Sequence, residues 1–515
     1  MQFQLNGDQV EVADDGASLL EVLRDGFGLT SVKDGCSPQG QCGCCTVLVD
    51  GEPRVSCVTP ARRVAGRRVD TLEGLDADVA EAWGATFCDA GASQCGFCTP
   101  GIVMRLEGLR SRGGDLADRA VVDRALAAHL CRCTGWQTIV EAAGSFGADR
   151  TPAGDGEAAG RRADRGARGP GGVAGGRARP WRLRRRCRAA RHAGGLRRVD
   201  GEWVTAATMT EARRRGQGAG PSHHGRPAAA DRTSGRRVGG HVADAVGRPG
   251  VPRDRCIVVC SGREASSPLA NGGAFGGKVD SPLPAEAAAL AGELGAPVRL
   301  RWSREDAVRL GPKRPPMAIG VDADGRGVVR VARTPGIVEA IASVAPDWTV
   351  EEVDVAGPPT SASIRAAGWG EVLAVRAALA AAPDGTVEVT APGGAWASAR
   401  VADGGVHVTV RCGDVLDATV LRSYAIGAVH MALGWVTSER LIVDDDGEVL
   451  SLTIRSLGIV RPGDMVPVDV ELVDEPDVEP TSGSDAVFVA TAAAVWAAQG
   501  RPPMWPTDRV LDSPA

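Results

Sequence analysis

Residues 34–51 read DGCSPQGQCGCCTVLVDG and carry four cysteines, of which Cys36, Cys42 and Cys45 are separated by five and then two residues. Cys57 follows after eleven more residues. A [2Fe–2S] cluster needs four thiolates, two for each iron, and a glycine-bearing loop can turn backbone amides toward its sulfurs. The spacing therefore predicts a cluster held by Cys36, Cys42, Cys45 and Cys57. The first gap is one residue longer than in plant-type ferredoxins.

The sequence around this loop predicts a small α+β unit. QFQLNGDQVEV at 2–12 alternates about an Asn-Gly pair, which favours a tight hairpin turn. SLLE at 18–21 is typical of a helix start, because its serine accepts a first-turn amide. A second hairpin is expected between strands at 46–49 and 54–58, joined by an Asp-Gly pair. We therefore predict one unit over residues 1–75.

A second group of cysteines follows in a helical context. Cys95 and Cys98 form a CxxC pair, and after 32 intervening residues Cys131 and Cys133 form a CxC pair. Apolar residues recur at helical spacing in two stretches between and after these cysteines, 121–130 and 136–143. We therefore predict a helical unit over residues 76–150. Paired cysteines of this kind are also typical of tetrahedral zinc. A neighbouring cluster favours a second iron–sulfur centre and hence an electron relay.

The remaining cysteines and the composition narrow the class of protein. Ten of the 14 cysteines precede residue 134, which favours ligand clusters over a disulfide framework. Cys44, beside Cys45, is expected to point away from the cluster and to pack as a small core or surface residue. No apolar run of about 18 residues or signal peptide is evident, so we expect a cytoplasmic protein without a membrane partner.

Residues 151–255 differ sharply from the rest, with 24 arginines, nine acidic residues, no lysine and no apolar period. A disordered basic linker that touches nucleic acid is one interpretation, since arginine clusters neutralise phosphates. A stretch translated out of frame from GC-rich DNA is the other, and it is the one that we favour. Under either interpretation we expect this segment to have little ordered structure and no hydrophobic core.

Three motifs together resemble the molybdenum hydroxylase family, which includes xanthine dehydrogenases, aldehyde oxidoreductases and aerobic carbon monoxide dehydrogenases. They are the 34–51 loop, QCGFCTPG at 94–101 and CRCTGW at 131–136. The resemblance covers residues 1 to about 145. It implies a β-grasp ferredoxin domain with one [2Fe–2S] cluster, and a four-helix domain with a second. The ligands implied for the second cluster are Cys95, Cys98, Cys131 and Cys133.

The same resemblance extends more weakly to residues 256–515, where we expect a mixed α+β region that binds a molybdopterin cofactor. NGGAFGGK at 271–278 resembles the family's cofactor loop. The cofactor contacts that the resemblance implies are Gln94, Gly272, Gly273, Phe275, Gly276 and Gly277. The predicted elements there are helices at 284–294 and 485–499, a strand at 405–411 and a hairpin at 441–455 turning near Asp446-Gly447.

The resemblance implies an oxidoreductase that oxidises an aldehyde or an N-heterocycle and passes electrons from a molybdopterin site through two [2Fe–2S] clusters, usually to a flavin-containing partner. The family's general base is a glutamate near the C-terminus. Here Asp485 stands near that place, and a helix N-cap is the interpretation we favour for it. An alternative function is an electron-transfer module whose C-terminal half is non-catalytic or binds a partner. A third possible function is a zinc-bearing protein that binds nucleic acid. We do not favour it and expect no nucleic-acid partner.

Overall fold

The computed structural model describes most of the two cysteine-bearing units and most of the C-terminal half. The described residues are 1–148 without Asp15 and Ser37, 193–197, 203–206, 256–259, 280–294, and 298–511 without Val510. Most of the 151–255 segment and the whole 271–278 loop, with Gly272, Gly273, Phe275, Gly276 and Gly277, lie outside the described residues. The domain limits at 75, 150 and 255 stay predictions.

The first unit is a five-stranded sheet with a short helix whose buried leucines share its core. Its strands are β1 (Gln2–Leu5), β2 (Asp8–Glu11), β3 (Thr46–Val49), β4 (Glu52–Val55) and β5 (Arg68–Asp70), in the order β2-β1-β5-β3-β4. β1 and β5 are parallel and the other pairs are antiparallel. Both predicted hairpins are confirmed, although the second strand of the second hairpin ends at Val55. The amide of Glu21 donates to Ser18 Oγ at 3.3 Å, which confirms the predicted helix start of α1 (Leu19–Glu21).

The second unit contains four helices, as the resemblance implied. They are α2 (Ala77–Asp89), α3 (Thr99–Arg110), α4 (Arg119–Leu126) and α5 (Gln137–Gly144). Trp83 of α2 is buried in the core, where its ring stacks on Phe146 at 4.1 Å between centroids. Its indole N–H donates to Glu107 at 2.9 Å, so the polar end of the side chain is satisfied. The helix predicted over 121–130 ends at Leu126, before the CRC motif.

The C-terminal half begins with a small sheet in the order β7-β6-β9-β8. Its strands are β6 (Ala193–Arg197), β7 (Trp203–Ala206), β8 (Cys256–Val259) and β9 (Val298–Arg301). β6 and β7 fall inside the segment for which we predicted low order, so part of that segment forms a hairpin instead. The predicted helix at 284–294 is confirmed as α8 (Leu283–Leu294), and α9 (Arg304–Leu310) follows β9.

Two further sheets complete the C-terminal half. One has the order β10-β11-β12, from β10 (Met317–Val321), β11 (Gly327–Ala332) and β12 (Thr349–Val353). The other has the order β13-β14-β15-β16, from β13 (Val387–Thr390), β14 (Trp396–Ala402), β15 (Gly405–Arg411) and β16 (Val468–Val473). The helices are α10 (Ile337–Ala342), α11 (Trp369–Leu379), α12 (Ala418–Thr437) and α13 (Ser484–Ala498). The strand predicted over 405–411 and the helix over 485–499 are confirmed.

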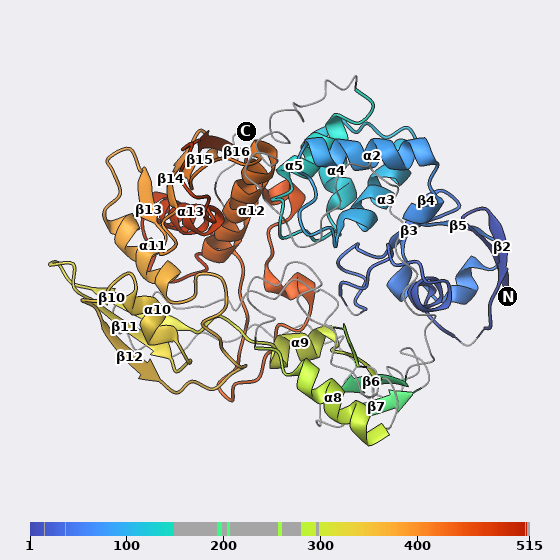
Figure 1. Cartoon of the computed structure of the whole chain (residues 1–515), viewed down its shortest axis with the longest axis horizontal. Helices are drawn as coiled ribbons and strands as arrows, with labels where there is room; N and C mark the ends of the chain where they lie inside the picture. Colours follow the sequence, from blue (N-terminus) through green and yellow to red (C-terminus); the bar gives the residue numbers. More distant parts are fainter. Residues whose placement is uncertain are drawn as a thin grey trace.

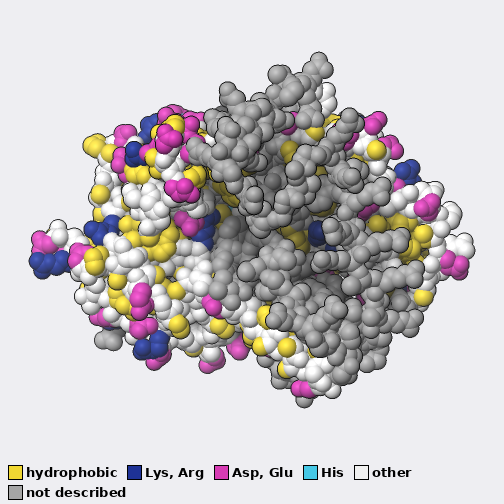
Figure 2. Space-filling view, in the orientation of Figure 1, with side chains coloured by type: hydrophobic (Ala, Val, Ile, Leu, Met, Phe, Trp, Pro, Cys, Tyr) yellow, Lys and Arg dark blue, Asp and Glu magenta, His cyan; other side chains and the backbone are white. Residues whose placement is uncertain are grey.

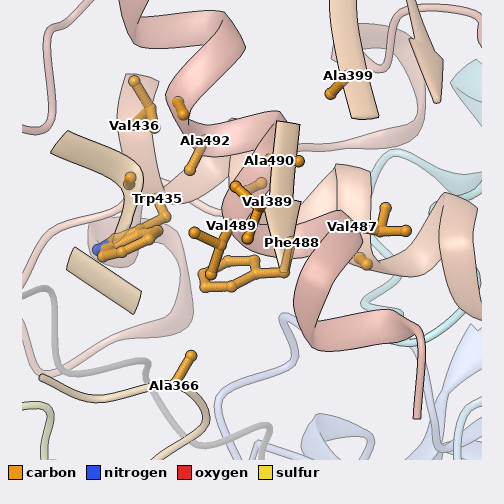
Figure 3. Close-up of a cluster of buried hydrophobic side chains, with 14 of the residues drawn as sticks. Ala366, Val389, Ala399, Trp435, Val436, Val487, Phe488, Val489, Ala490 and Ala492 are labelled. Atoms are coloured by element: carbon orange, nitrogen blue, oxygen red, sulfur yellow. The ribbon is translucent and has the colours of Figure 1, made fainter. Parts of the chain in front are cut away.

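The core of this half lies around α13, which is buried along most of its length. The indole of Trp435 in α12 stacks on Phe488 in α13, with the ring centroids 4.8 Å apart (Figure 3). Val389 of β13 and Ala366, which precedes α11, lie in the same cluster (Figure 3). The apolar run of α13 thus packs between two helices and a sheet, and this accounts for its lack of a polar face.

The hairpin predicted over 441–455 is wrong in most of its length. Only one bridge, between Val443 and Val449, joins its arms, and residues Ile454–Leu457 form a 3-10 helix instead. The turn at Gly447 is present, with a φ of +87°. Near the turn the arms are still joined, since the amide of Leu450 donates to the carbonyl of Ile442 at 2.8 Å. From Leu452 onward the second arm hydrogen-bonds Gln39 and Gln41 of the first cysteine loop instead, so it does not continue as a strand.

The two cysteine-bearing units lie against one side of the C-terminal half, and α12 runs next to α5 (Figure 1). On the face seen in Figure 2, acidic, basic and hydrophobic side chains of the described part of the C-terminal half are interspersed. No helix among the described residues is long and apolar enough to span a membrane. The mixed α+β, multidomain prediction is confirmed.

Candidate iron–sulfur sites

The β3–β4 hairpin brings the four cysteines of the first set together. Cys36, Cys42 and Cys45 lie in the loop before β3, and Cys57 lies in a 3-10 helix (Ser56–Val58) after β4. The antiparallel register pairs the start of β3 with the end of β4. The amide of Ser56 donates to the carbonyl of Cys45 at 3.2 Å, and its hydroxyl does so at 2.8 Å. Cys57 is thereby held beside Cys45.

The four thiols of this set are buried and in mutual contact. The Cys36 sulfur accepts hydrogen bonds from Cys42 and Cys57, and these lower the pKa of Cys36 to about 3. Donating to Cys36, and burial, raise the pKa of Cys42 and of Cys57 far above the ordinary value. Cys57 also contacts Cys45. Four buried sulfurs therefore lie close together, away from water.

The loop also directs backbone toward these sulfurs. The amide of Gln39 donates to Cys36 Sγ at 3.2 Å, and the amide of Gln41 contacts the same sulfur. A Cβ at Gly35 would lie only 2.7 Å from Cys42 Sγ, so the backbone there is too close to the sulfur to leave room for a side chain. Four converging thiols with amides aimed at sulfur fit a [2Fe–2S] cluster.

Cys44 is buried next to this set. Its thiol donates to the carbonyl of Cys42 at 3.5 Å, and it also contacts the Cys42 side chain. We expected Cys44 to be either a small core residue or a surface residue, and the structure places it in the core. Its exclusion as a ligand stays a prediction.

The second set joins two helix boundaries. Cys95 and Cys98 stand directly before α3, and Cys131 and Cys133 lie in the connection between α4 and α5. The Cys98 thiol donates to Cys131, which lowers the pKa of Cys131 and raises that of Cys98. Cys95 lies close enough to Cys98, and Cys133 to Cys131, for the charge of each to raise its neighbour's pKa. The structure thus gathers all four predicted ligands.

Cys131 receives further support from Thr134, whose hydroxyl lies 3.1 Å from the sulfur and whose amide also donates to it. Among the described residues, no three histidine, cysteine or acidic side chains form a group that could hold a single metal ion. A [2Fe–2S] cluster spreads its four thiolates over two irons. The four thiols gathered between the helix boundaries match the number of thiolates that such a cluster takes.

The two sets meet backbone to backbone, which sequence reasoning did not foresee. A Cβ at Gly101 in α3 would lie 2.4 Å from the carbonyl oxygen of Gly43 and 2.9 Å from Cys44 Cα. The ring of His129 lies against Gly43, whose φ is +67°, and its Nε2 is 3.3 Å from Thr46 Oγ1. Glycines at both contact points are the signal that was available in the sequence.

Gln94 joins the second set to the C-terminal half. Its amide nitrogen donates to the carbonyl of Cys133 at 2.7 Å and to the hydroxyl of Ser423 in α12 at 2.9 Å. The resemblance placed Gln94 at the pterin edge, and that role stays a prediction. A Cβ at Gly427 in α12 would lie 1.7 Å from the Cys133 carbonyl oxygen, so α12 packs directly on the CRC motif.

Arg132, between the two predicted ligands of the CRC motif, forms a buried ion pair with Glu439. Arg132 is 2% exposed and Glu439 is 1% exposed. Arg132 Nη2 donates to Glu439 Oε2 at 2.7 Å, and a second guanidinium nitrogen donates to the other carboxylate oxygen. This bidentate pair fixes the CRC motif to the end of α12.

The interpretation of Asp485 as a helix N-cap is wrong. α13 begins at Ser484, its N-cap is Gly483, and no side chain caps it. The Asp485 carboxylate instead accepts from Arg365, which also donates to Ser484 Oγ at 2.7 Å. Arg365 lies 120 positions away in the sequence, so no local pattern indicated this ion pair.

The fold and the two thiol sets define a two-cluster iron–sulfur protein. The model of the "2Fe-2S iron-sulfur cluster binding domain" matches residues 3–69, and that of the "[2Fe-2S] binding domain" matches residues 71–144. The small FeS subunit of nicotinate dehydrogenase from Eubacterium barkeri is 39% identical over 141 residues, which is 27% of this chain and 88% of that subunit. The xanthine dehydrogenase iron-sulfur-binding subunit of Escherichia coli O157:H7 is 41% identical over 148 residues, 27% of this chain and 84% of that subunit.

The chain belongs to the molybdenum hydroxylase family, and its cysteine-bearing units correspond to the family's iron–sulfur subunits. The solved structure of the aldehyde oxidoreductase from Desulfovibrio gigas matches 98% of this chain and 99% of that chain, with a TM-score of 0.66 and 14% sequence identity. At this identity the match establishes the fold only, and the fold agrees with the resemblance.

Proposed function

We propose that this chain is an oxidoreductase component that carries electrons one at a time, from a molybdopterin site through the Cys95 set and then the Cys36 set. The observation that carries the proposal is the continuous contact from α12 to Cys133 and from Gly101 to Gly43. Electron transfer weakens steeply with distance, so direct packing of the two sites on each other and on α12 suits a relay.

Eight cysteines would hold the two clusters. They are Cys36, Cys42, Cys45 and Cys57 for the first cluster, and Cys95, Cys98, Cys131 and Cys133 for the second. When bound, each cluster supplies a one-electron redox centre. The protein's own part is to exclude water from the thiols and to hold amides of Gln39, Gln41 and Thr134 at the sulfurs. Such hydrogen bonds stabilise the negative charge of the sulfurs.

For the substrate we propose only a chemical class, and for the partners only a type of subunit. The relatives named for nicotinate, xanthine and aldehyde favour an N-heterocycle or an aldehyde as substrate. Relatives that are separate small subunits favour further subunits, and a flavin-containing one would accept the electrons. We also propose a cytoplasmic location. Apart from Gln94, the residues proposed for the molybdopterin cofactor lie outside the described residues.

Iron content and electron paramagnetic resonance (EPR) test the two clusters on the full chain. We expect about four irons per chain and two reducible signals, since each cluster carries two irons. Cys57→Ser and Cys133→Ser are each expected to lose one signal and about half of the iron. Cys44→Ser is the matched control and should keep both. An iron-free wild-type chain, or a Cys44→Ser variant that loses the first signal, would contradict this ligand assignment.

A second candidate is an electron-transfer module whose C-terminal half serves only as a scaffold or partner-binding region. The ion pair between Asp485 and Arg365 favours it, because the carboxylate near the place where we expected the family's base is engaged by an arginine. Molybdenum analysis of the same sample separates the two. Stoichiometric molybdenum supports the complete oxidoreductase, whereas iron alone supports the module.

A further inference from the structure

The first cysteine loop is covered by segments from the C-terminal half. Gln39 Nε2 donates to Glu305 Oε1 in α9 at 2.7 Å and to the carbonyl of Leu452 at 3.0 Å. The amide of Ile454 donates back to Gln39 Oε1 at 3.2 Å. One side chain of the loop therefore holds two segments that lie 266 and 413 positions away. The loop is enclosed by residues that its own domain does not supply.

Arg304 lies behind this loop at the start of α9. Its side chain is buried, and its Nη2 donates to the carbonyl of Gly35 at 3.2 Å. A Cβ at Gly35 would lie 2.7 Å from Cys42 Sγ, so the backbone of Gly35 lies against that sulfur. The guanidinium is therefore separated from a predicted ligand by about one peptide group. A capping box fixes the position: the amide of Asp306 donates to Ser303 Oγ at 3.0 Å, and the amide of Ser303 donates to Asp306 at 3.3 Å.

The charge of Arg304 is close to the thiols. Burial lowers its pKa to about 10, while the negative charges of Cys36 and Cys42 act in the opposite direction. Arginine therefore stays protonated at neutral pH. The acids that also face it are Glu305 and Asp34, and Asp34 acts on Cys36 too. The site contains a buried cation next to two predicted ligands, with acidic charges nearby.

We propose that Arg304 raises the reduction potential of the cluster held by the Cys36 set, so that the C-terminal half tunes the electron relay that it covers. The inference rests on the proposed function, since it needs a cluster at this site. Reduction adds one negative charge to the cluster. A buried cation stabilises the reduced state more than the oxidised state, because screening by water is weak there. Net charge and solvent exposure are two of the properties that set such potentials.

Anaerobic dithionite titration of the full chain, followed by EPR, tests the proposal. Arg304→Gln and Arg304→Met remove the charge, and the second of these keeps an apolar stem. We expect the first cluster to become harder to reduce by about tenfold, a shift of about 59 mV to lower potential for one electron. The second cluster should titrate as in the wild-type chain. Arg304→Lys keeps a cation and should stay near the wild-type potential.

Arg326→Gln is the matched control, because Arg326 is an exposed residue in the turn between β10 and β11. It changes net charge equally and should leave both potentials unchanged. Cys57→Ser and Cys133→Ser assign the two signals. If both uncharged variants lose the first cluster while Arg304→Lys keeps it, the requirement for a cation is supported.

Three results would overturn the role of Arg304. They are unchanged potentials in both uncharged variants, an equal shift of both clusters, and loss of the first cluster in Arg304→Lys as well. If the wild-type chain binds no cluster through the Cys36 set, the proposed function fails and the inference fails with it. Clusters at normal iron content with unchanged potentials would remove the inference alone.

Discussion

At the scale of single residues, the contact between Gly427 and Cys133 leaves no space for a side chain. The atom that a Cβ would meet is a backbone carbonyl oxygen 1.7 Å away, and a backbone atom cannot rotate aside. Gly427→Ala should therefore push α12 away from the CRC motif and cost about 1–3 kcal/mol, the usual range for overpacking. We expect a lower urea midpoint by circular dichroism and weaker visible absorbance of the second cluster.

The matched control for Gly427→Ala is Gly292→Ala, at an exposed glycine in α8 with no atom within 4 Å of its Cβ position. Alanine favours a helix over glycine by up to about 1 kcal/mol, so this variant should be neutral or slightly more stable. Equal midpoints for the two alanine variants would contradict the close packing of α12.

A buried histidine, His430, should make the folding stability of the chain fall at acidic pH. Burial lowers the pKa of His430 from 6.5 to about 3, and the nearby Arg132 acts in the same direction. Below pH 6.5 the unfolded chain takes up a proton here while the folded chain does not, so folding stability is full above pH 6.5 and falls as the pH drops toward 3. The loss approaches about 1.4 kcal/mol per pH unit.

His430→Gln isolates this contribution. Glutamine keeps an N–H for the carbonyl of Val460, which His430 Nε2 contacts at 3.0 Å, but it does not titrate. Between pH 7.5 and pH 5, its urea midpoint should fall less than that of the wild-type chain. Identical slopes for wild type and His430→Gln would count against the buried neutral histidine.

The two groups of neighbouring cysteines could be predicted from the sequence because their residues are close together in the chain and chemically distinctive. Cysteine spacing indicated both sets, and the structure places the members of each set close together. The ion pairs of Arg132 and Arg365 were missed, because their acidic partners lie 307 and 120 positions away. Arginine and acidic residues are common throughout the chain, so nothing in the local pattern marks one of them as buried.

At the scale of elements, predictions held where a segment's own pattern decides its structure and failed where a distant contact does. The Asn-Gly hairpin and α13 follow from local turn chemistry and from an unbroken apolar run. The alternating 441–455 segment also had a strand pattern, but the carbonyl of Leu452 and the amide of Ile454 bond Gln39 instead of a neighbouring strand. Tertiary hydrogen bonds outweighed β-propensity there.

Two ion pairs that connect the helical unit to the α12 region provide a comparison between buried and exposed charges. Arg132 pairs with Glu439 in the interior, while Arg422 of α12 pairs with Glu141 of α5 at 2.7 Å with both side chains more than one-third exposed. Glu439→Gln should lower stability by about 3–5 kcal/mol, because it leaves a buried guanidinium without its counter-charge. Glu141→Gln should cost less than about 1 kcal/mol.

Thermal unfolding at 0.05 and 0.5 M NaCl measures both effects. We expect a large fall in Tm for Glu439→Gln that depends little on salt, and a small fall for Glu141→Gln that disappears at high salt. A Glu439→Gln variant as stable as Glu141→Gln would show that the buried pair does not hold the CRC motif to α12.

At the scale of the whole molecule, the C-terminal half contacts both cysteine sets through different segments. α12 packs on the second set, and α9 with residues 452–455 covers the first. These contacts join positions more than 260 residues apart, so neither periodicity nor motif spacing could predict them. In two relatives the matching part is a separate subunit, the small FeS subunit of a nicotinate dehydrogenase and the iron-sulfur-binding subunit of a xanthine dehydrogenase. Whether the contacts of this chain hold its two parts together without chain continuity can be tested directly.

Cutting the chain between the two parts tests this attachment. A specific protease site inserted after Ala153 would divide the protein, and we expect the two pieces to co-elute in size-exclusion chromatography at 0.15 M NaCl. The buried Arg132–Glu439 pair and the Gln94–Ser423 hydrogen bonds hold them together. Combining Gln94→Ala with Glu439→Gln should release the pieces, because a buried charge then loses its partner. Arg422→Gln removes only an exposed pair and should leave them joined. Pieces that separate without any substitution would mean that these contacts contribute too little to keep the relay docked.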